Sequence, residues 1–592
     1  MTKAQQEGQS LDKLAGIMAD IAGHYNDLIQ DFLSHQGQAG GTNPDVTGLG
    51  RTYLELSASL MQNPGKLFEA QTQAWTAYTN LWLNSAKAML GEETSPVREP
   101  GTGDRRFRHA AWDEHPFFSF IKQSYLVTAD AILSAVSDVD DIDQKTAGKA
   151  QFYTRQFVDA MSPTNFLLTN PEVLEATLDS KGENLLKGMQ NFIDDIDAET
   201  GLLRIKMTDE QAFEPGVNIA VTPGKVVFQN DLFQLLQYEP STGKTFRKPL
   251  LIMPPWINKY YVLDLQPQNS MIKWLVEQGH TVFVISWVNP DEKLAHKDFE
   301  HYVTEGSVAA IDAVEQATGE SGINIVGYCI GGTLLAATLA YLQATGDARV
   351  ASATFFVSLI DFSIPGDLGV FIDEQQLESL EQTMNERGYH DGKEMAATFN
   401  LLRSNDLIWS FYVRNYLLGK DPFPFDLLYW NADSTRLPAR MHSTYLRTMY
   451  LKNEFREPGG LSVAGTPIDV STIRVPAYFI STEEDHIAPW EGTYLGAQLL
   501  SGPVKFVLGK SGHIAGVINP PDAQKYGYYT GPDVDRPAAE WHDNAELHPG
   551  SWWPDWQAWL EQFAGGKIPA RTPGGNGRTV IEDAPGSYIK MP

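Results

Sequence analysis

Short apolar runs in the second half of the chain are separated by segments long enough to form helices. The runs cover residues 248–253, 281–285, 323–326, 353–360, 476–480 and 504–508. Their hydrophobic character is nearly continuous, as it is in strands that are buried on both faces of a parallel sheet. Strands that alternate with helices predict an α/β fold, in which helices cover both faces of the sheet.

The beginning of the chain has a helical pattern instead. Amphipathic segments at 11–33 and 67–90 are separated by a glycine-rich break at 36–41. The second segment carries a stripe of large apolar side chains, which are Phe68, Trp75, Tyr78, Leu81, Trp82 and Met89. Packing inside a helical domain is the commoner use of such a stripe, and docking to an apolar particle or a partner helix is the alternative. We expect a helical region at 1–104 and a helical domain at 105–215.

A long insertion separates the fourth and fifth apolar runs. Residues 361–475 exceed a single crossover helix, and they contain a predicted helix at 403–420 and an aromatic run at 423–430. Long insertions of this kind commonly form lids over an active site. We therefore expect a cap at about 362–472 inside a catalytic domain that spans residues 216–592. From residue 565 onward the chain is rich in Gly and Pro, which predicts irregular structure.

Composition and charge narrow the possible partners. The formal net charge of −29 argues against general binding to nucleic acid. The single cysteine excludes an intramolecular disulfide and is typical of the reducing cytoplasm. Residues 387–457 are locally basic, with ten Lys and Arg against eight Asp and Glu, so they are candidates for contacting an anionic group.

Localisation and cofactors can also be predicted. The first residues lack the apolar core of a signal peptide. Residues 322–342 are as apolar as a membrane span, but their glycines favour a buried strand, turn and helix. Neither a histidine pair at helical spacing nor a cysteine cluster is present, so we expect no metal and no cofactor. We expect a soluble cytoplasmic protein without a transmembrane segment.

The one cysteine, Cys329, lies in the sequence Gly327-Tyr328-Cys329-Ile330-Gly331-Gly332 between a predicted strand and a predicted helix. A nucleophile elbow has this organisation, with a serine or cysteine exposed at the sharp turn from strand to helix. The glycines permit the tight turn, and the positive end of the helix dipole favours a thiolate. The pattern predicts that Cys329 is a nucleophile for acyl transfer.

Such a nucleophile needs a base and an orienting carboxylate, and both follow later strands. His513 comes after the run at 504–508, and Asp485 comes after the run at 476–480. Glu483 and Glu484 compete with Asp485 for the role of the acid. His280 precedes a strand and so lies on the wrong side of the sheet. The order of nucleophile, acid and histidine along the chain indicates the triad Cys329, Asp485 and His513.

Two backbone N–H groups should form an oxyanion hole. The first belongs to Ile330, which follows the nucleophile, and the second to the loop at 254–261. Prolines at the start of that loop donate nothing, so Trp256, Ile257 or Asn258 must supply the second donor, and we assign it to Ile257. Five further residues are expected to contact the substrate: Trp256, Asn258, Tyr260, Trp430 and His486.

From Asp104 to its C-terminus the chain resembles class I polyhydroxyalkanoate synthases. The resemblance is carried by the elbow and by separated motifs, which are Asp104-Arg105-Arg106-Phe107, Ser162-Pro163-Thr164-Asn165, Thr169-Asn170-Pro171-Glu172, Pro254-Pro255-Trp256-Ile257-Asn258-Lys259-Tyr260-Tyr261, Asp485-His486-Ile487, Gly512-His513-Ile514-Ala515-Gly516 and Ser551-Trp552-Trp553-Pro554. Trp256 departs from the pattern, because a smaller residue often stands there. The departure leaves the shape of the acyl pocket open.

The resemblance implies an α/β-hydrolase fold with an inserted, mobile cap, preceded by a variable, mainly helical N-terminal domain. It implies an acyltransferase that polymerises (R)-3-hydroxyacyl-CoA, of short chain length such as 3-hydroxybutyryl-CoA, into a polyester with release of CoA. Cys329 would carry the growing chain, His513 would activate it, and Asp485 would activate the incoming 3-hydroxyl group or support His513. The implied partners are the polyester granule surface, granule-associated proteins and a second copy in a homodimer.

Two alternatives stay open. One is a hydrolase on the same fold, either a thioesterase or a depolymerase, in which water attacks the acyl-enzyme. The other is a non-catalytic granule-coat protein that works through its helical N-terminal half. An intact triad favours an enzyme over the coat protein, and a cysteine in place of serine favours transfer over hydrolysis.

Overall fold

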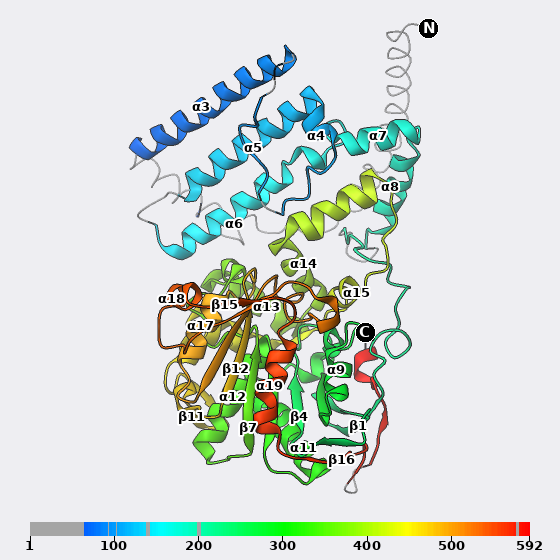
Figure 1. The fold of residues 1–592 in the computed structure, drawn as a ribbon, viewed down its shortest axis with the longest axis vertical. Coiled ribbons are helices and arrows are strands. Elements are labelled where there is room, and N and C mark those ends of the chain that lie inside the picture. Colours follow the sequence, from blue (N-terminus) through cyan, green and yellow to red (C-terminus); the bar gives the residue numbers. More distant parts are fainter. Residues whose placement is uncertain are drawn as a thin grey trace. The chain divides into compact units, whose positions relative to one another are not determined.

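The computed structural model describes residues 52, 64–90, 92, 94–101, 103–137, 142–197, 203–575 and 579–591. The chain divides into two compact units (Figure 1). The helical unit contains Met1–Asp209 and Phe399–Phe423, and the sheet unit contains Glu210–Thr398 and Pro424–Pro592. The expected boundary at 215/216 lies six residues beyond the observed one. The amphipathic segment at 11–33 and the break at 36–41 lie outside the described residues.

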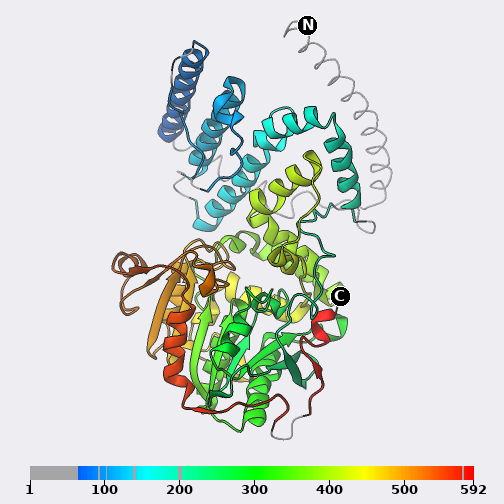
Figure 2. The same ribbon diagram turned by 45° about the vertical axis from the view of Figure 1, so that its right-hand side comes forward.

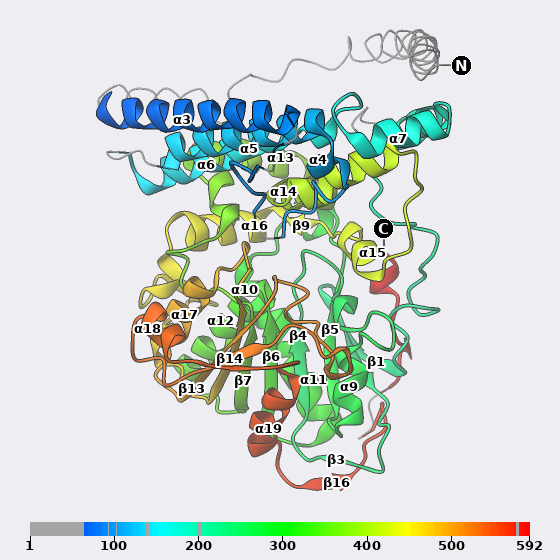
Figure 3. The same ribbon diagram turned by 45° about the horizontal axis from the view of Figure 1, so that its top comes forward.

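Helices make up most of the helical unit. They are α3 (Pro64–Met89), α4 (Ala111–Glu114), α5 (Pro116–Ser137), α6 (Gln144–Ala160), α7 (Pro171–Asp179) and α8 (Glu183–Asp194), with a short 3-10 turn η1 at Pro163–Asn165. The Asp143 carboxylate accepts from the first N–H groups of α6, and Asn170 does the same for α7, so the sequence defines both starts. Helix α3 packs along α5 (Figure 3).

The aromatic stripe of α3 is only partly used for packing. Leu81 is buried and the Trp82 ring lies 5.3 Å from that of Phe120, whereas Phe68 and Trp75 are 71% and 76% exposed. Packing inside a helical domain, the commoner use of such a stripe, therefore accounts for Leu81 but not for the two exposed rings.

Residues 399–423 join the helical unit although the sequence predicted them to be part of the cap. The helix expected at 403–420 is present as two π-helical segments, η6 (Asn405–Trp409) and η7 (Tyr412–Leu417). The Tyr416 hydroxyl donates to Asp195 at 2.6 Å, and the Asn184 amide donates to the Leu417 carbonyl at 2.8 Å. Gly188 permits this approach, since a Cβ there would lie 1.9 Å from the Tyr416 carbonyl oxygen.

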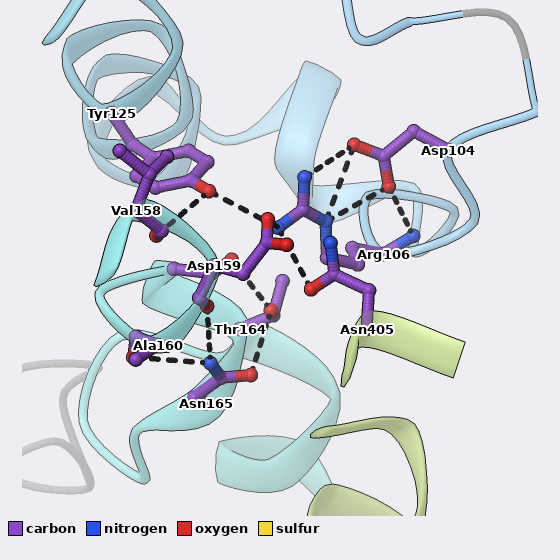
Figure 4. Close-up of polar contacts among 10 residues, drawn as sticks. Asp104, Arg106, Tyr125, Val158, Asp159, Ala160, Thr164, Asn165 and Asn405 are labelled. Atoms are coloured by element: carbon purple, nitrogen blue, oxygen red, sulfur yellow. Dashed lines mark hydrogen bonds and ion pairs between the residues drawn. The ribbon is translucent and has the colours of Figure 1, made fainter. Parts of the chain in front are cut away.

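A mostly buried arginine joins the same segment to the rest of the helical unit (Figure 4). The Arg106 guanidinium pairs with Asp104 at 2.9 Å and with Asp159 at 3.3 Å. It also donates to the Tyr125 hydroxyl at 3.1 Å and to the Asn405 side-chain oxygen at 3.2 Å. Each polar group of this cluster therefore has a charged or hydrogen-bonding partner, as burial requires.

An 11-stranded sheet forms the centre of the sheet unit, in the order β15-β14-β13-β12-β7-β6-β4-β5-β2-β1-β17. Figure 2 shows this sheet with helices packed around it. Its middle is parallel and consists of the expected strands, β4 (Leu250–Met253), β5 (Val282–Trp287), β6 (Ile323–Tyr328), β7 (Val350–Phe356), β12 (Ala477–Thr482) and β13 (Val504–Gly509). Antiparallel strands extend both edges, and they are β1 (Gly224–Gln229), β2 (Phe233–Tyr238), β17 (Glu582–Asp583), β14 (Tyr528–Thr530) and β15 (Glu546–His548). The prediction of a largely parallel α/β sheet is confirmed.

Helices connect and cover these strands. The main ones are α9 (Met271–Glu277), α11 (Ala309–Thr318), α12 (Ile330–Thr345), α17 (Trp490–Gln498) and α19 (Trp553–Ala564). The remainder of the predicted cap supplies α13 (Glu374–Arg387), α14 (Gly392–Leu402), α15 (Asp426–Ala432), α16 (Ala439–Tyr445) and the π-helical segment η8 (Leu446–Leu451). No helix in the described ranges is long and apolar enough to cross a membrane.

The C-terminal tail is more ordered than its Gly and Pro content predicted. Strand β16 (Lys567–Pro569) pairs with β3 (Lys244–Phe246), and β17 pairs with β1. The Tyr588 hydroxyl donates to the Asn230 carbonyl at 2.7 Å, and Ile589 is buried. Backbone pairing to an edge strand needs no hydrophobic run, which explains why the pattern missed it.

Candidate active site

Cys329 occupies the turn between β6 and α12. Its φ of 54° and ψ of −123° are strained for a residue with a side chain, as in a nucleophile elbow. The flanking glycines are required by close backbone contacts. A Cβ on Gly327 would lie 2.5 Å from the Gly332 Cα, and one on Gly331 would lie 2.2 Å from the Met253 carbonyl oxygen. The turn therefore brings the nucleophile against the end of β4.

Two backbone N–H groups lie at the turn, those of Cys329 and Ile330. The Cys329 N–H donates to the Phe356 carbonyl at 2.8 Å, which fixes the turn. Ile330 begins α12, so its N–H has no acceptor within the helix. This position also carries the positive end of the helix dipole. The role of the Ile330 N–H as a donor to an oxyanion stays a prediction.

Asp485 follows β12, and His513 follows β13. Strands β6, β7, β12 and β13 are neighbours and run parallel, so the residues that follow them lie at the same edge of the sheet. The His513 Nδ1 atom lies 2.7 Å from one carboxylate oxygen of Asp485. The other oxygen accepts from the N–H groups of Ile487 and Ala488, each at 2.9 Å. The Asp485 side chain is fully buried, and that of His513 is 9% exposed.

The competing acids lie elsewhere. Glu483 is partly exposed and lies 3.7 Å from His542. Glu484 has no ion pair with a His, Lys or Arg among the described residues, and its backbone N–H donates to the Ser511 carbonyl at 3.0 Å. Only Asp485 among the three carboxylates contacts His513 within this part of the chain.

Electrostatics favour a charged imidazole at this position. Burial lowers the pKa of His513, but the negative charges of Asp485 and Cys329 and hydrogen bonds to both raise it to about 10. Because Nδ1 is occupied by Asp485, Nε2 is the atom left to contact the thiol. The Cys329 side chain is partly exposed. The arrangement provides an imidazolium beside a sulfur nucleophile that a substrate can reach.

Two tyrosines that the sequence analysis missed lie close to the nucleophile. Burial raises the pKa of both Tyr445 and Tyr450, and the charge of Cys329 raises it further. Asp485 adds to the effect at Tyr450. The two rings lie 5.6 Å apart, and Phe362 lies 4.9 Å from Tyr450. These rings therefore bring two polar hydroxyls and apolar surface near enough to Cys329 for its charge to affect both hydroxyls.

The π-helical geometry of η8 explains why these tyrosines were not found. They are five residues apart, which places them on different faces of an ordinary α-helix. A π-helix has i to i+5 hydrogen bonds, so residues five apart come to the same face. The sequence offered one signal for these tyrosines, an aromatic pair five residues apart inside the predicted cap.

The loop at 254–261 lies beside the elbow, and Thr435 of the predicted cap holds it in place. The Thr435 N–H donates to the Ile257 carbonyl at 2.9 Å, and the Thr435 hydroxyl donates to the Trp256 carbonyl. Both carbonyls are thereby occupied, and the direction of the Ile257 N–H stays a prediction. The Trp256 indole is 2% exposed and packs among Trp287, Tyr302 and Phe299.

The other expected substrate contacts have structural partners. The Asn258 amide faces the carbonyls of Trp430 and Asn431, both at 3.4 Å, and the Trp430 indole donates to the Lys259 carbonyl at 2.6 Å. Tyr260 is buried with Tyr238 of β2, three strands from β6 in the sheet. The His486 carbonyl accepts from Asp367 at 2.9 Å. The structure brings together the triad, and it surrounds Tyr260 with core residues.

The basic residues of the predicted cap are largely paired. Arg447 contacts Glu381 at 2.6 Å and also pairs with Glu374, and Arg440 lies 2.9 Å from Asp298. Arg436 lies over the Tyr389 ring, and Arg414 lies over the Phe423 ring in the helical unit. Among the described residues, no cluster of His, Cys, Asp and Glu could hold a metal ion.

Comparisons with known proteins indicate the family to which the chain belongs. Residues 103–275 match the family model described as the poly-beta-hydroxybutyrate polymerase (PhaC) N-terminus, and residues 239–520 match the alpha/beta hydrolase fold. A poly(3-hydroxyalkanoate) polymerase subunit of Rhizobium meliloti (strain 1021) is 48% identical over 92% of this chain and 89% of its own. A poly(3-hydroxyalkanoate) polymerase of Methylorubrum extorquens is 47% identical, and the match covers 92% of this chain and 90% of that polymerase. That of Cupriavidus necator is 42% identical over 94% of each chain.

Proposed function

The chain belongs to the poly(3-hydroxyalkanoate) polymerase family of acyltransferases, and on that premise we propose that it joins (R)-3-hydroxyacyl units from CoA thioesters into a polyester held on Cys329. The observation that carries the proposal is the joined triad: a cysteine at a strained elbow, contacted by a histidine that a buried aspartate orients. The proposed substrates are hydroxyacyl-CoA thioesters of short chain length, such as 3-hydroxybutyryl-CoA.

In the first step the Cys329 sulfur attacks the thioester carbonyl of the substrate. The carbon–sulfur bond to CoA breaks, and the CoA thiolate leaves with a proton from His513. The N–H of Ile330 and one from the loop at 256–258 would hold the negative oxygen of the intermediate. One thioester replaces another, so the exchange is nearly isoenergetic and the acyl group stays activated.

In the second step the 3-hydroxyl group of another unit attacks the acyl group on Cys329. A new oxygen–carbon ester bond forms, the bond to sulfur breaks, and the hydroxyl proton passes to a base. The incoming unit still carries its CoA thioester, so the lengthened chain returns to Cys329 by a repeat of the first step, which releases that CoA. His513 is the proposed base, because both oxygens of Asp485 already have partners. Those contacts favour a supporting role for Asp485 over direct activation of the hydroxyl.

Water competes with the hydroxyl for the acyl-enzyme, so polymer synthesis needs a site with little water. Burial of Asp485, His513 and Tyr445 and the apolar ring of Phe362 support that condition. A thioesterase or depolymerase would instead need an ordered route for water. We further propose, from the family resemblance, a cytoplasmic homodimer that works at the surface of polyester granules.

The proposal is tested with purified protein and (R)-3-hydroxybutyryl-CoA. Free CoA thiol and insoluble polyester are both measured, and trapped protein is digested and analysed by mass spectrometry. We expect both products and a hydroxybutyryl adduct on the peptide that contains Cys329. Thiol release without polymer would identify a hydrolase. Polymer without any adduct on this cysteine would contradict the proposed chemistry, and absence of both products would support a non-catalytic coat protein.

A further inference from the structure

We propose that Trp256 is a specificity-determining residue whose indole restricts the acyl side chain to a short one, an inference that rests on the proposed function. Trp256 follows β4 by three residues and is almost fully buried. It lies close to Cys329 by two independent routes, one through the backbone and one through side chains.

The backbone route runs through the elbow. Gly331, two residues after the nucleophile, lies so close to β4 that a Cβ there would be 2.2 Å from the Met253 carbonyl oxygen and 2.9 Å from that of Pro254. Trp256 comes only two residues after Pro254. Its carbonyl accepts from the Thr435 hydroxyl, which holds the loop in place. The Trp256 backbone is therefore fixed beside the start of α12.

The side-chain route is a row of three aromatic rings, Trp256, Phe299 and Tyr445, which we call the aromatic row. The Trp256 and Phe299 rings lie 6.5 Å apart. Phe299 stacks on Tyr445 with a centroid distance of 6.4 Å and an angle of 19°. Tyr445 in turn is near enough to Cys329 for the charge of that residue to raise the pKa of the tyrosine. The aromatic row thus leads from the loop at 254–261 toward the region of Cys329.

Ring packing, rather than a hydrogen bond, holds the indole in this position. The Trp256 ring lies 4.7 Å from Tyr302 and 5.6 Å from Trp287. The neighbouring Trp287 indole donates to the Pro254 carbonyl at 2.9 Å. Within the described part of the chain, the buried Trp256 N–H has no acceptor. Phenylalanine should therefore preserve most of what tryptophan contributes, and alanine should not.

The chemistry of the substrate makes this position selective. Each unit on Cys329 carries a side chain at its third carbon, and in this proposal that side chain lies against the aromatic row. A closely packed aromatic cluster does not yield easily to additional methylene groups. One methylene changes kcat/KM by about 10–200-fold in a hydrophobic site. The aromatic row would therefore favour a methyl over a propyl substituent.

The test compares Trp256→Ala with Trp256→Phe, and uses Trp541→Ala as a matched control. Trp541 is fully buried in the sheet unit but packs with Tyr494 and Phe506. CoA release gives kcat/KM for (R)-3-hydroxybutyryl-CoA and (R)-3-hydroxyhexanoyl-CoA, and the composition of polymer made from an equal mixture is measured. We expect Trp256→Ala to raise the relative kcat/KM for the hexanoyl substrate at least about 10-fold. Trp256→Phe and Trp541→Ala should leave the ratio within about twofold of the starting protein.

Several outcomes would overturn the inference. An unchanged ratio in folded Trp256→Ala, or an equal change in Trp541→Ala, would show that the indole does not select the substrate. The same conclusion follows if the unaltered protein uses both substrates equally. Should Trp256→Ala fail to fold, Trp256→Leu replaces it with the same expected direction. Release of CoA without polymer would refute the proposed function, while the ratio of the two release rates would still test Trp256.

Discussion

Cys329, Asp485 and His513 come from three separate loops, yet Asp485 and His513 share a hydrogen bond, and the charge of Cys329 raises the pKa of His513. Asp485 uses one oxygen for two backbone N–H groups and the other for His513, so its carboxylate cannot rotate without losing a partner. That constraint directs the opposite nitrogen of the imidazole toward the sulfur. The proposed chemistry of the site therefore depends on individual atoms of three residues.

Replacing the nucleophile should separate transfer from hydrolysis. Cys329→Ser is expected to lower the rate of polymer formation by about 100-fold or more, because an oxyester on serine is less activated than a thioester. Polymer mass and free CoA thiol are measured together. The melting temperature serves as the control for folding. Polymer formation that remains at half its original rate would contradict the role of sulfur.

The charge of His513 should make stability depend on pH. Its folded-state pKa of about 10 exceeds the usual value of 6.5. The stabilising contribution is therefore complete below pH 6.5 and is lost as pH rises through about 10. Urea unfolding at pH 7 and pH 10 should show a larger loss of unfolding free energy in the unaltered protein than in His513→Gln. Equal losses in the two proteins would mean that His513 is not stabilised as a cation.

At the scale of elements, the π-helical segment η8 sets which side chains surround the nucleophile. Tyr445 and Tyr450 reach the same side because one turn contains an additional residue. The cap thus contributes to the site through helix geometry as well as through residue type.

Removing one residue from η8 tests this arrangement. Deletion of Thr448 should convert the turn to an α-helix in which the two tyrosines stand four residues apart and stay on the same side, so that kcat stays within about threefold, whereas Tyr450→Leu should lower kcat by roughly 10-fold or more with little change in melting temperature. Thr448→Ala keeps the length of the turn and serves as the control. Full activity in Tyr450→Leu, with its fold intact, would show that the tyrosine pair is not needed.

Much of the sheet and the triad was predictable because both leave local signals. Continuous apolar runs identified β4, β5, β6, β7, β12 and β13, and glycines with ordered polar residues identified Cys329, Asp485 and His513. Tyr445 and Tyr450 were missed because their spacing has meaning only in a π-helix. Strand β17 was missed because it pairs through backbone groups with β1, far away in the sequence. The location of residues 399–423 depends on contacts such as Tyr416 to Asp195, which no local pattern encodes.

At the scale of the whole molecule, the chain passes repeatedly between the two units. It leaves the helical unit at Asp209, returns at Phe399 and leaves again after Phe423. Within the helical unit, Arg106 contacts both the N-terminal helices and Asn405 of the returning segment. This one side chain joins parts of the sequence that are 299 residues apart.

Loss of the Arg106 side chain should therefore loosen the returning segment. Arg106→Ala leaves the carboxylates of Asp104 and Asp159 without their partner, which costs about 3–5 kcal/mol of unfolding free energy for the helical unit. Amide hydrogen exchange should become faster at 399–423. Arg105→Ala removes an exposed neighbour and should change neither quantity. Unaltered exchange in Arg106→Ala would show that other contacts suffice.

The path of residues 399–423 has a practical consequence for dissecting this enzyme. A truncation that begins at Glu210 would retain a 25-residue stretch whose packing surfaces have been deleted, and would invite aggregation. A cleaner fragment would also excise that stretch and bridge Thr398 to Pro424 with a short linker. Conversely, a fragment that ends at Asp209 would need the same stretch supplied as a separate peptide to complete its fold.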